Sequence, residues 1–243
     1  MIALLRKEIR SFLTSLIGYI VIAVFLIVTS LFMWVFPGSL NVMEAEYATL
    51  DTLFYIAPWV FLFLIPAITM RSLAEEQKEG TLELLMTKPI TDLQIILAKY
   101  LAGLLVVVIA IFPTLVYFLS VYLLGNPVGN IDAGATWGSY LGLIFLASVY
   151  VSIGIFASSL TKNQIVAFLI AALISFVMYS GFQSLGTFNL FGSLDRFIIR
   201  LGMEDHYSGM SIGLIDSRDV LYFVGVSAFF ILLTRLRLQA RNW

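Results

Sequence analysis

Few side chains in this sequence could take part in a chemical reaction. Cysteine is absent and His206 is the single histidine, which excludes thiolate nucleophiles, cysteine metal sites and a histidine metal cluster within one chain. The long apolar runs contain serines, but no histidine, aspartate or glutamate that could activate them as nucleophiles. We therefore expect no catalytic residue and no metal site, which counts against an intramembrane protease or lipid transferase. His206 follows acidic Glu204 and Asp205 in a polar segment, where we expect it to be a structural hydrogen-bonding group.

The sequence also lacks the features that bind nucleotides or nucleic acids. It has no G-x-x-x-x-G-K-[ST] motif, so we expect the chain not to hold ATP phosphates itself. The 14 Lys and Arg and 15 Asp and Glu residues leave a formal charge of −1, which provides no positive field for nucleic acid. Any power from ATP must therefore come from a separate chain.

The charges best placed for a protein contact are concentrated in residues 71–92, RSLAEEQKEGTLELLMTKPITD. Ser72 and Glu75 have the spacing of a capping box, which predicts a short helix that ends at Gly80. Five acidic residues in one connector beside an anionic membrane surface favour contact with a soluble partner. An ordinary loop whose helices lie on the membrane is the alternative. The acidic residues are Glu75, Glu76, Glu79, Glu83 and Asp92.

A second short helix is expected directly after Gly80. Thr81 is predicted to be its N-cap, with Glu83 in the first turn and Pro89 ending the helix. Thr91 and Gln94 form another capping box, which starts the next apolar helix. One face of the second helix is apolar and is expected to meet either a partner or the bilayer; it consists of Leu82, Leu85 and Met86.

The composition places these charges on an integral membrane protein. Of 243 residues, 60% are hydrophobic and 12% charged, and the charged share is about half that of a soluble domain. Six apolar runs are interpreted as membrane helices, which predicts an all-α membrane protein with one domain over residues 1–243. The spans are expected at about residues 16–36, 52–70, 99–124, 137–160, 165–185 and 220–234.

Residues 1–15 are predicted to form an amphipathic helix in the headgroup region before the first span. The alternative is a basic flank that only orients this span. The apolar run that follows is too long for a signal-peptide core, so we expect an uncleaved anchor. The apolar face of the helix consists of Ile2, Leu5, Ile9 and Phe12, and the basic residues around it are Arg6, Lys7 and Arg10.

The distribution of basic residues predicts the orientation. With a cytoplasmic N-terminus and six spans, eleven of the 14 Lys and Arg residues lie on the cytoplasmic side, as the positive-inside rule requires. Both termini and residues 71–92 are therefore expected in the cytoplasm. The outer segment before the last span is expected to contain a short helix on the outer leaflet, with an apolar face of Leu194, Phe197, Ile198 and Leu201.

The spans carry small polar residues and prolines instead of charges near their middles. This absence counts against an ion-coupled carrier. Two stripes of polar side chains suit helix packing, with a substrate path as the alternative; they are Ser148 and Ser152 in the fourth span and Ser175, Tyr179 and Gln183 in the fifth. The expected hinge positions are Pro58 and Pro66 in the second span and Pro113 in the third.

The stretch from Glu75 to Lys99 resembles a signature of the ABC-2 type exporter permeases. The signature reads E-G-T-L-E-x-L-x-x-x-P followed by a lysine, and lies between the second and third spans of that family. Residues 7–10, KEIR, are similar to the family's elbow helix. Residues 213–223, GLIDSRDVLYF, together with the length and the six spans, resemble gliding-motility-associated permease subunits. The positions that match the signature are Glu79, Gly80, Thr81, Leu82, Glu83, Leu85, Pro89 and Lys99.

This resemblance implies a permease subunit in a bacterial inner membrane. The loop would be a coupling helix that docks on a separate ABC ATPase, which would bind ATP and Mg²⁺. Two permeases, which are the same or related chains, would assemble with two ATPases. ATP-driven closure of the two ATPases would move the coupling helices and tilt the spans. A membrane scaffold that recruits an ATPase for a motility or secretion machine is the alternative function.

Overall fold

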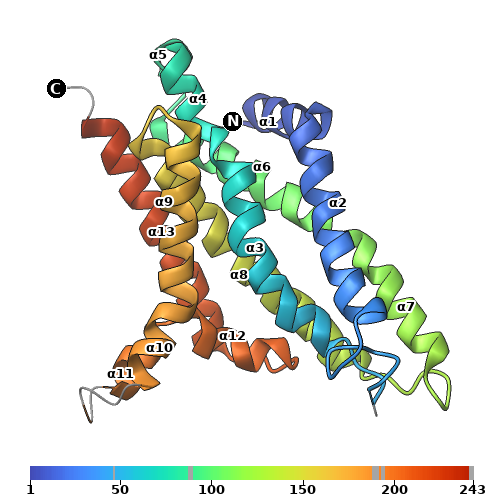
Figure 1. Ribbon diagram of the computed structural model, residues 1–243. Coiled ribbons are helices and arrows are strands. Elements are labelled where there is room, and N and C mark those ends of the chain that lie inside the picture. Colours follow the sequence, from blue (N-terminus) through green and yellow to red (C-terminus); the bar gives the residue numbers. More distant parts are fainter. Residues whose placement is uncertain (46, 87–89, 188–191, 193–194, 241–243) are drawn as a thin grey trace.

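A computed structural model describes residues 1–45, 47–86, 90–187, 192 and 195–240. Within these residues the chain is helical and has no β-strand, as expected of an all-α protein. Figure 1 shows the helices bundled, with α1 and the last turns of α13 at the same end, which we call the α1 end. Among the described residues, six stretches are long and apolar enough to cross a membrane, which confirms the expected number of spans. They are Leu16–Val35, Asp51–Glu79, Asp92–Leu124, Ala133–Leu160, Gln164–Thr187 and Ser217–Gln239.

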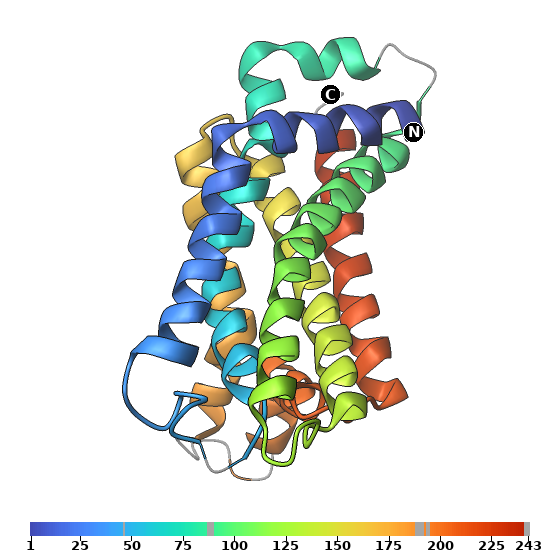
Figure 2. The same ribbon diagram turned by 90° about the vertical axis from the view of Figure 1, so that its right-hand side faces the viewer.

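The N-terminal helix α1 (Ile2–Thr14) turns sharply into α2 (Leu16–Ser30), which continues as the π-helical turn η1 (Leu31–Val35). Figure 2 shows α1 lying across the end of the bundle and α2 running along it. The hydroxyl of Ser15 accepts the backbone N–H of Gly18 at 3.1 Å and so caps α2. A Cβ at Gly18 would lie 2.3 Å from the carbonyl oxygen of Phe12, so this corner requires a glycine.

The second span, α3 (Asp51–Thr69), leads into α4 (Arg71–Glu79) and α5 (Thr81–Met86), which project beyond the bundle at the α1 end (Figure 1). Pro58 and Pro66 both lie inside α3. Pro58 cannot donate a hydrogen bond to the carbonyl of Phe54 one turn earlier. The hydroxyl of Tyr207 donates to that carbonyl instead, at 2.8 Å. The Phe54 carbonyl therefore has a hydrogen-bond donor although no water is available inside a membrane.

The third span consists of α6 (Asp92–Ile111), the 3-10 turn η2 (Phe112–Thr114) and α7 (Leu115–Leu124). Thr91 and Gln94 form the expected capping box. The helix therefore begins at Asp92, as this capping box predicted, and it extends before Lys99, where the membrane span was expected to begin. Pro113 lies in η2, where the chain changes from α-helical to 3-10 geometry.

The fourth span, α8 (Ala133–Leu160), is the centre of the bundle. It packs against α3, α6, α9, α12 and α13, and its side chains are buried on all faces along most of its length. A Cβ at Gly154 would lie 1.9 Å from the Thr69 hydroxyl oxygen, so the glycine lets α8 approach the end of α3 closely. This close approach occurs beside the junction of α3 and α4.

The remaining elements are α9 (Gln164–Phe176), the π-helical turn η3 (Val177–Gly181), α10 (Phe182–Thr187), α11 (Asp195–Ile199), α12 (Met203–Ser211) and α13 (Ser217–Gln239). The helices α10 to α12 lie at the end opposite to α1 (Figure 1). In α11, Phe197 is 63% exposed, which fits the apolar outer face expected there, while Leu194 lies outside the described residues. The tight contact between α12 and α8 places the Cβ of Met210 against Gly142.

Candidate functional site

Three segments that are far apart in the sequence come together at the α1 end of the bundle. Figure 2 shows α1 crossing this end, with the α4–α5 segment beyond it. The helix α1 packs on α6, and α4 packs on α8. The charged stretch singled out in the sequence therefore lies against the N-terminal helix and the start of the third span.

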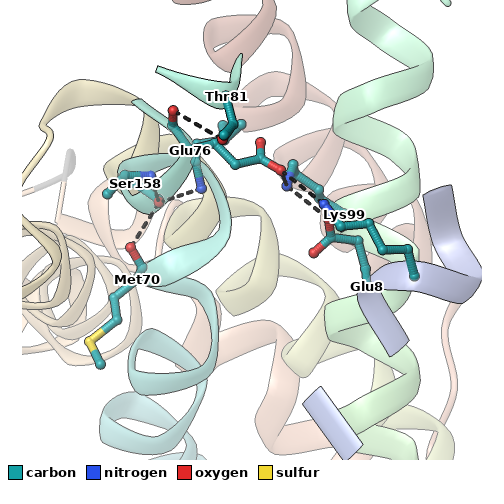
Figure 3. Close-up of polar contacts among 9 residues, drawn as sticks. Glu8, Met70, Glu76, Thr81, Lys99 and Ser158 are labelled. Atoms are coloured by element: carbon teal, nitrogen blue, oxygen red, sulfur yellow. Dashed lines mark hydrogen bonds and ion pairs between the residues drawn. The ribbon is translucent and has the colours of Figure 1, made fainter. Parts of the chain in front are cut away.

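A buried ion-paired cluster, made of Glu8, Glu76 and Lys99, joins these three segments. The Lys99 side chain is 1% exposed, and its Nζ lies 3.0 Å from Glu8 Oε1 of α1 and 2.9 Å from Glu76 Oε1 of α4 (Figure 3). Lys7 Nζ lies 3.9 Å from the same Glu76 oxygen. Because a buried ammonium is costly without partners, the cluster holds α1, α4 and α6 in one arrangement.

Sequence reasoning missed this cluster. Lys99 was expected at the start of a span, and Glu8 was not given a role among the basic residues around it. The available signal was a lysine inside an apolar helix, which needs a carboxylate partner. The two carboxylates lie 91 and 23 residues from Lys99 in the sequence, so only the fold identifies them.

The ion-paired cluster lies beside a small apolar contact. Leu4, Ile95 and Ala98 are buried together, with Leu5 and Leu85 packed against them. This contact brings α1, α5 and α6 together. The buried face of α1 thus contains Leu4 and Glu8, whereas Ile2 of the predicted apolar face is 76% exposed.

The basic side chains of α1 remain on the surface. Arg6, Lys7 and Arg10 are exposed, as expected of basic residues that surround an amphipathic helix. Their positions leave them available to anionic headgroups, which is consistent with the predicted interfacial position of α1.

The start of α4 differs from the expected capping box. Ser72 makes no capping bond and is buried inside the helix, which follows α3 after the single residue Met70. The hydroxyl of Ser158 in α8 accepts the backbone N–H groups of Leu73 and Ala74, both at 2.9 Å, and donates to the Met70 carbonyl at 2.9 Å (Figure 3). The expected cap was wrong because a serine of another helix supplies these bonds.

A second hydrogen bond fixes α4 to the end of α8. The Gln77 side-chain amide donates to the Ser159 carbonyl at 3.1 Å. Such a bond also satisfies a carbonyl that the C-terminus of α8 leaves without a helical donor. Together with Ser158, it anchors α4 to the central helix of the bundle.

The second short helix, α5, also differs in its start and in its exposed face. Gly80 adopts the expected left-handed conformation, with φ of 71°. Thr81 is not an N-cap: it lies within α5, and its hydroxyl donates to the Glu76 carbonyl at 3.5 Å. Leu82 is 3% exposed and belongs to the core, so the expectation that it meets a partner or lipid is wrong. The side chain of Leu82 packs with the buried residues of the main core instead.

The part of this segment that is open to a partner is charged. Lys78, Glu79, Gly80 and Glu83 are exposed, whereas Glu75 and Glu76 are partly covered and Leu85 faces α1. Glu75 pairs with Arg71 one turn earlier at 3.1 Å. The side chain of Met86 and the whole of Pro89 lie outside the described residues.

The polar stripes of the spans mostly serve their own helices. The Ser148 hydroxyl donates to the Phe145 carbonyl at 2.6 Å, and the Ser152 hydroxyl donates to the Val149 carbonyl at 2.7 Å. Ser148 also lies 3.2 Å from Ser227 of α13. Both serines are buried, which favours the helix-packing interpretation for the fourth span.

The stripe on the fifth span lies in an aromatic environment. The Tyr179 ring packs edge-on against Trp59 of α3, with ring centres 5.5 Å apart, and near Tyr150 of α8 at 6.4 Å. Ser175 is fully buried. Among the described residues, neither its hydroxyl nor the buried Oε1 of Gln183 has a hydrogen-bond partner. A substrate path along this stripe stays a prediction.

At the opposite end, His206 is held as a structural hydrogen-bonding group, as expected. Its Nδ1 lies 2.7 Å from Asp219 Oδ1 and its Nε2 lies 2.9 Å from the Arg200 carbonyl. Its ring stacks on Tyr222 with ring centres 3.9 Å apart.

Burial also affects the acid–base properties of α12. It raises the pKa of the Glu204 carboxyl and raises that of the Tyr207 hydroxyl well above its ordinary value. The Tyr207 hydroxyl therefore stays protonated and can donate to the carbonyl of Phe54.

A family model described as ABC-2 family transporter protein matches residues 2–191. This range contains α1, the α4–α5 segment, the ion-paired cluster and the first five spans. A search of curated proteins finds no match.

Proposed function

The chain belongs to the ABC-2 family of transporter proteins, and from this premise we propose that it couples a separate ABC ATPase to substrate export through the α4–α5 segment. Membership makes the chain a multi-pass membrane permease subunit, whose family members are not ATPases themselves. The direction of transport, the docking segment and the pairing with a second permease are part of the proposal.

The observation that carries the proposal is the buried ion-paired cluster. A loop that only connects two spans needs no tie to the N-terminal helix, yet Lys99 binds both Glu8 of α1 and Glu76 of α4. A force applied to the exposed part of α4 and α5 would reach α1 and the third span through these ion pairs. It would reach the centre of the bundle through the bonds of Ser158.

The proposed orientation places the α1 end in the cytoplasm, at the inner membrane of a bacterium. The basic residues exposed on α1 and the excess of Lys and Arg at this end support it. ATP and Mg²⁺ would then be bound by the ATPase on the same side. Pro58, Pro66 and Pro113 remain the proposed hinges. We add the α3–α4 junction at Met70, whose carbonyl accepts a hydrogen bond from Ser158, as a further proposed hinge.

We extend the proposal to a gliding-motility-associated transporter because residues 213–223 resemble such subunits. This segment lies beyond the matched range, which ends at residue 191. A scaffold that recruits an ATPase without moving a substrate is the competing function. ATP-dependent movement of a candidate substrate into vesicles would distinguish the two.

Charge reversal of the exposed face of α5 tests the docking claim. We expect Glu83→Lys to weaken binding of the ATPase about tenfold, because it reverses a charge at the proposed interface. Pull-down and ATP hydrolysis of the reconstituted complex measure the effect. Glu44→Lys is the matched control, since Glu44 is exposed at the other end of the bundle. Equal ATPase binding by the Glu83 variant and the wild type would disprove the docking claim.

A further inference from the structure

Two of the three expected hinge prolines lie beside tyrosine hydroxyls that come from other helices. The first is Pro58 of α3, which leaves the carbonyl of Phe54 without its helical donor. The hydroxyl of Tyr207 in α12 donates to this carbonyl at 2.8 Å, and both residues are buried. Because no water competes for such a bond inside a membrane, the bond ties the Pro58 turn of α3 to α12.

The second proline is Pro113, which lies in the 3-10 turn η2 of the third span. The hydroxyl of Tyr140 in α8 donates to the Thr114 carbonyl at 3.1 Å and lies 3.0 Å from the Thr114 hydroxyl. The Thr114 hydroxyl donates in turn to the carbonyl of Ile111 at 2.6 Å. Tyr140 and Thr114 are buried. These bonds tie the Pro113 turn to the central helix of the bundle.

A ring contact joins these two sets of bonds. The ring of Phe54 packs edge-on against the ring of Tyr140, with ring centres 5.1 Å apart. Phe54 therefore provides both the carbonyl that Tyr207 binds and the ring that packs on Tyr140. A continuous series of buried contacts thus runs from α12 past the Pro58 turn to the Pro113 turn; it consists of Tyr207, Phe54, Tyr140 and Thr114.

The helix α12, which begins this series, is itself fixed to two spans at the end opposite to α1 (Figure 1). The hydroxyl of Ser139 in α8 donates to the Ser211 carbonyl at 2.9 Å. The hydroxyl of Tyr222 in α13 donates at 2.6 Å to the carbonyl of Leu201, just before α12. Because α12 is held on α8 and α13, the Tyr207 bond fixes α3 to this assembly.

We propose that Tyr207 and Tyr140 are positioning residues that couple both proline turns to α12, so that Pro58 and Pro113 change geometry together and with α12. This inference rests on the proposed role of the two prolines as hinges. Packed interiors switch between discrete arrangements and do not deform continuously, so a shift of α12 alters the Pro113 turn as well. A movement that begins at α4 reaches the third span and α12 through Phe54.

Spin labels in the permease alone, in nanodiscs, test the coupling. Cysteines replace Leu123 near the end of α7 and Lys162 after α8, both exposed, and the distance between the labels reports the Pro113 turn. The labelled chain is diluted with unlabelled chain. We expect Tyr207→Phe to raise the population of a second distance about tenfold, because the lost hydrogen bond changes the equilibrium by about this factor. An unchanged distance distribution would overturn the proposal.

Tyr222→Phe is the matched control for Tyr207→Phe. It also removes one hydroxyl that binds a main-chain carbonyl beside α12, but this carbonyl belongs to Leu201 and not to a proline turn. The control should keep the narrow distribution of the wild type. A thermal unfolding curve verifies that each variant is folded. The same second distance in Tyr222→Phe would show that any loosening of α12 is sufficient, which would overturn the specific role of Tyr207.

Phe54→Leu tests the ring contact that joins the two tyrosines. This variant keeps the main-chain carbonyl that Tyr207 binds and removes the ring that packs on Tyr140. If the ring contact carries the coupling, adding Tyr207→Phe to Phe54→Leu should not increase the second distance further, since effects within one coupled series are not additive. A further increase in the double variant would overturn this route.

Glu83→Lys in the labelled chain separates this inference from the docking claim. The measurement contains no ATPase, so the distance distribution should stay narrow whether or not Glu83 contacts an ATPase. A failed docking claim therefore leaves the coupling between the proline turns measurable. A second distance in Glu83→Lys would show that a charge change at the α1 end alone releases the Pro113 turn, which would overturn the role of Tyr207.

Discussion

At the scale of single residues, Lys99 is the side chain on which the α1 end depends most. It is buried inside a membrane-spanning helix, and its ammonium faces carboxylates from two other elements. Removing one member of a buried ion group costs more than removing the whole group, since the remaining charges stay buried without partners. Replacing Lys99 alone should therefore destabilise the protein more than replacing Lys99, Glu8 and Glu76 together.

Lys99→Met should lower the free energy of unfolding by about 3 to 5 kcal/mol, because it leaves Glu8 and Glu76 buried together without a cation. The triple variant Glu8→Leu, Glu76→Leu, Lys99→Met should recover most of this loss. Unfolding in nanodiscs measures both variants. If Lys99→Met alone were as stable as the wild type, the buried ion pairs would not hold this end together.

Glu204 predicts a pH dependence at the opposite end of the bundle. Burial raises its pKa above the ordinary 4.5, so the folded chain binds this proton more tightly than the unfolded chain. Between 4.5 and the raised pKa, the free energy of unfolding must fall as the pH rises. Glu204→Gln does not titrate and should become more stable relative to the wild type over this range. Parallel melting temperatures of the two proteins from pH 4 to 7 would contradict this prediction.

At the scale of elements, α4 is the connection between the exposed charges and the interior. One face of it joins α1 and α6 through Glu76, and its start joins α8 through Ser158. The helix is thus held at two places that belong to different parts of the bundle. The proposed docking segment is an extension of the packed spans and not a free loop.

Ser158→Ala should uncouple α4 from α8. It leaves the N–H groups of Leu73 and Ala74 without their acceptor, at a cost of about 1 to 3 kcal/mol. The expected result is weaker stimulation of ATP hydrolysis by the permease, with little change in ATPase binding. Ser159→Ala is the control, since its hydroxyl donates only within α8, to Phe156, at 2.6 Å. The same loss of stimulation in both variants would contradict a specific role for Ser158.

Local features of this segment could be predicted from the sequence. The left-handed Gly80 and the capping box of Thr91 and Gln94 have signals within a few residues. The predicted N-cap at Ser72 is wrong because α4 follows α3 directly, and Ser158 of α8 accepts the backbone N–H groups of Leu73 and Ala74. The predicted N-cap at Thr81 is wrong because this residue lies within α5. Leu82 was placed on the wrong side because hydrophobic periodicity shows a face but not which neighbour covers it.

At the scale of the whole molecule, the six spans could be predicted because apolar length alone defines them. Which spans pack against each other could not be predicted, and α8 was not recognised as the central helix. Small residues such as Gly154 indicate close contacts, but they do not indicate the partner helix. For the same reason the meeting of α1 with α4 and α6 required the structure.

The absence of cysteine makes this arrangement directly measurable. Spin labels on cysteines introduced at Arg10 of α1 and Lys78 of α4, both exposed, would report the distance between the two helices in the complex with its ATPase. The labelled chain is mixed with an excess of unlabelled chain, so that distances within one permease are observed.

The central claim is that α1 and α4 move as one unit when the ATPase acts. We predict that the distance distribution between labels at Arg10 and Lys78 is narrow and unchanged by ATP in the wild type, and broad in Lys99→Met. A wild-type distance that shifts on ATP binding would contradict the account, since α1 and α4 would then move separately despite the ion pairs.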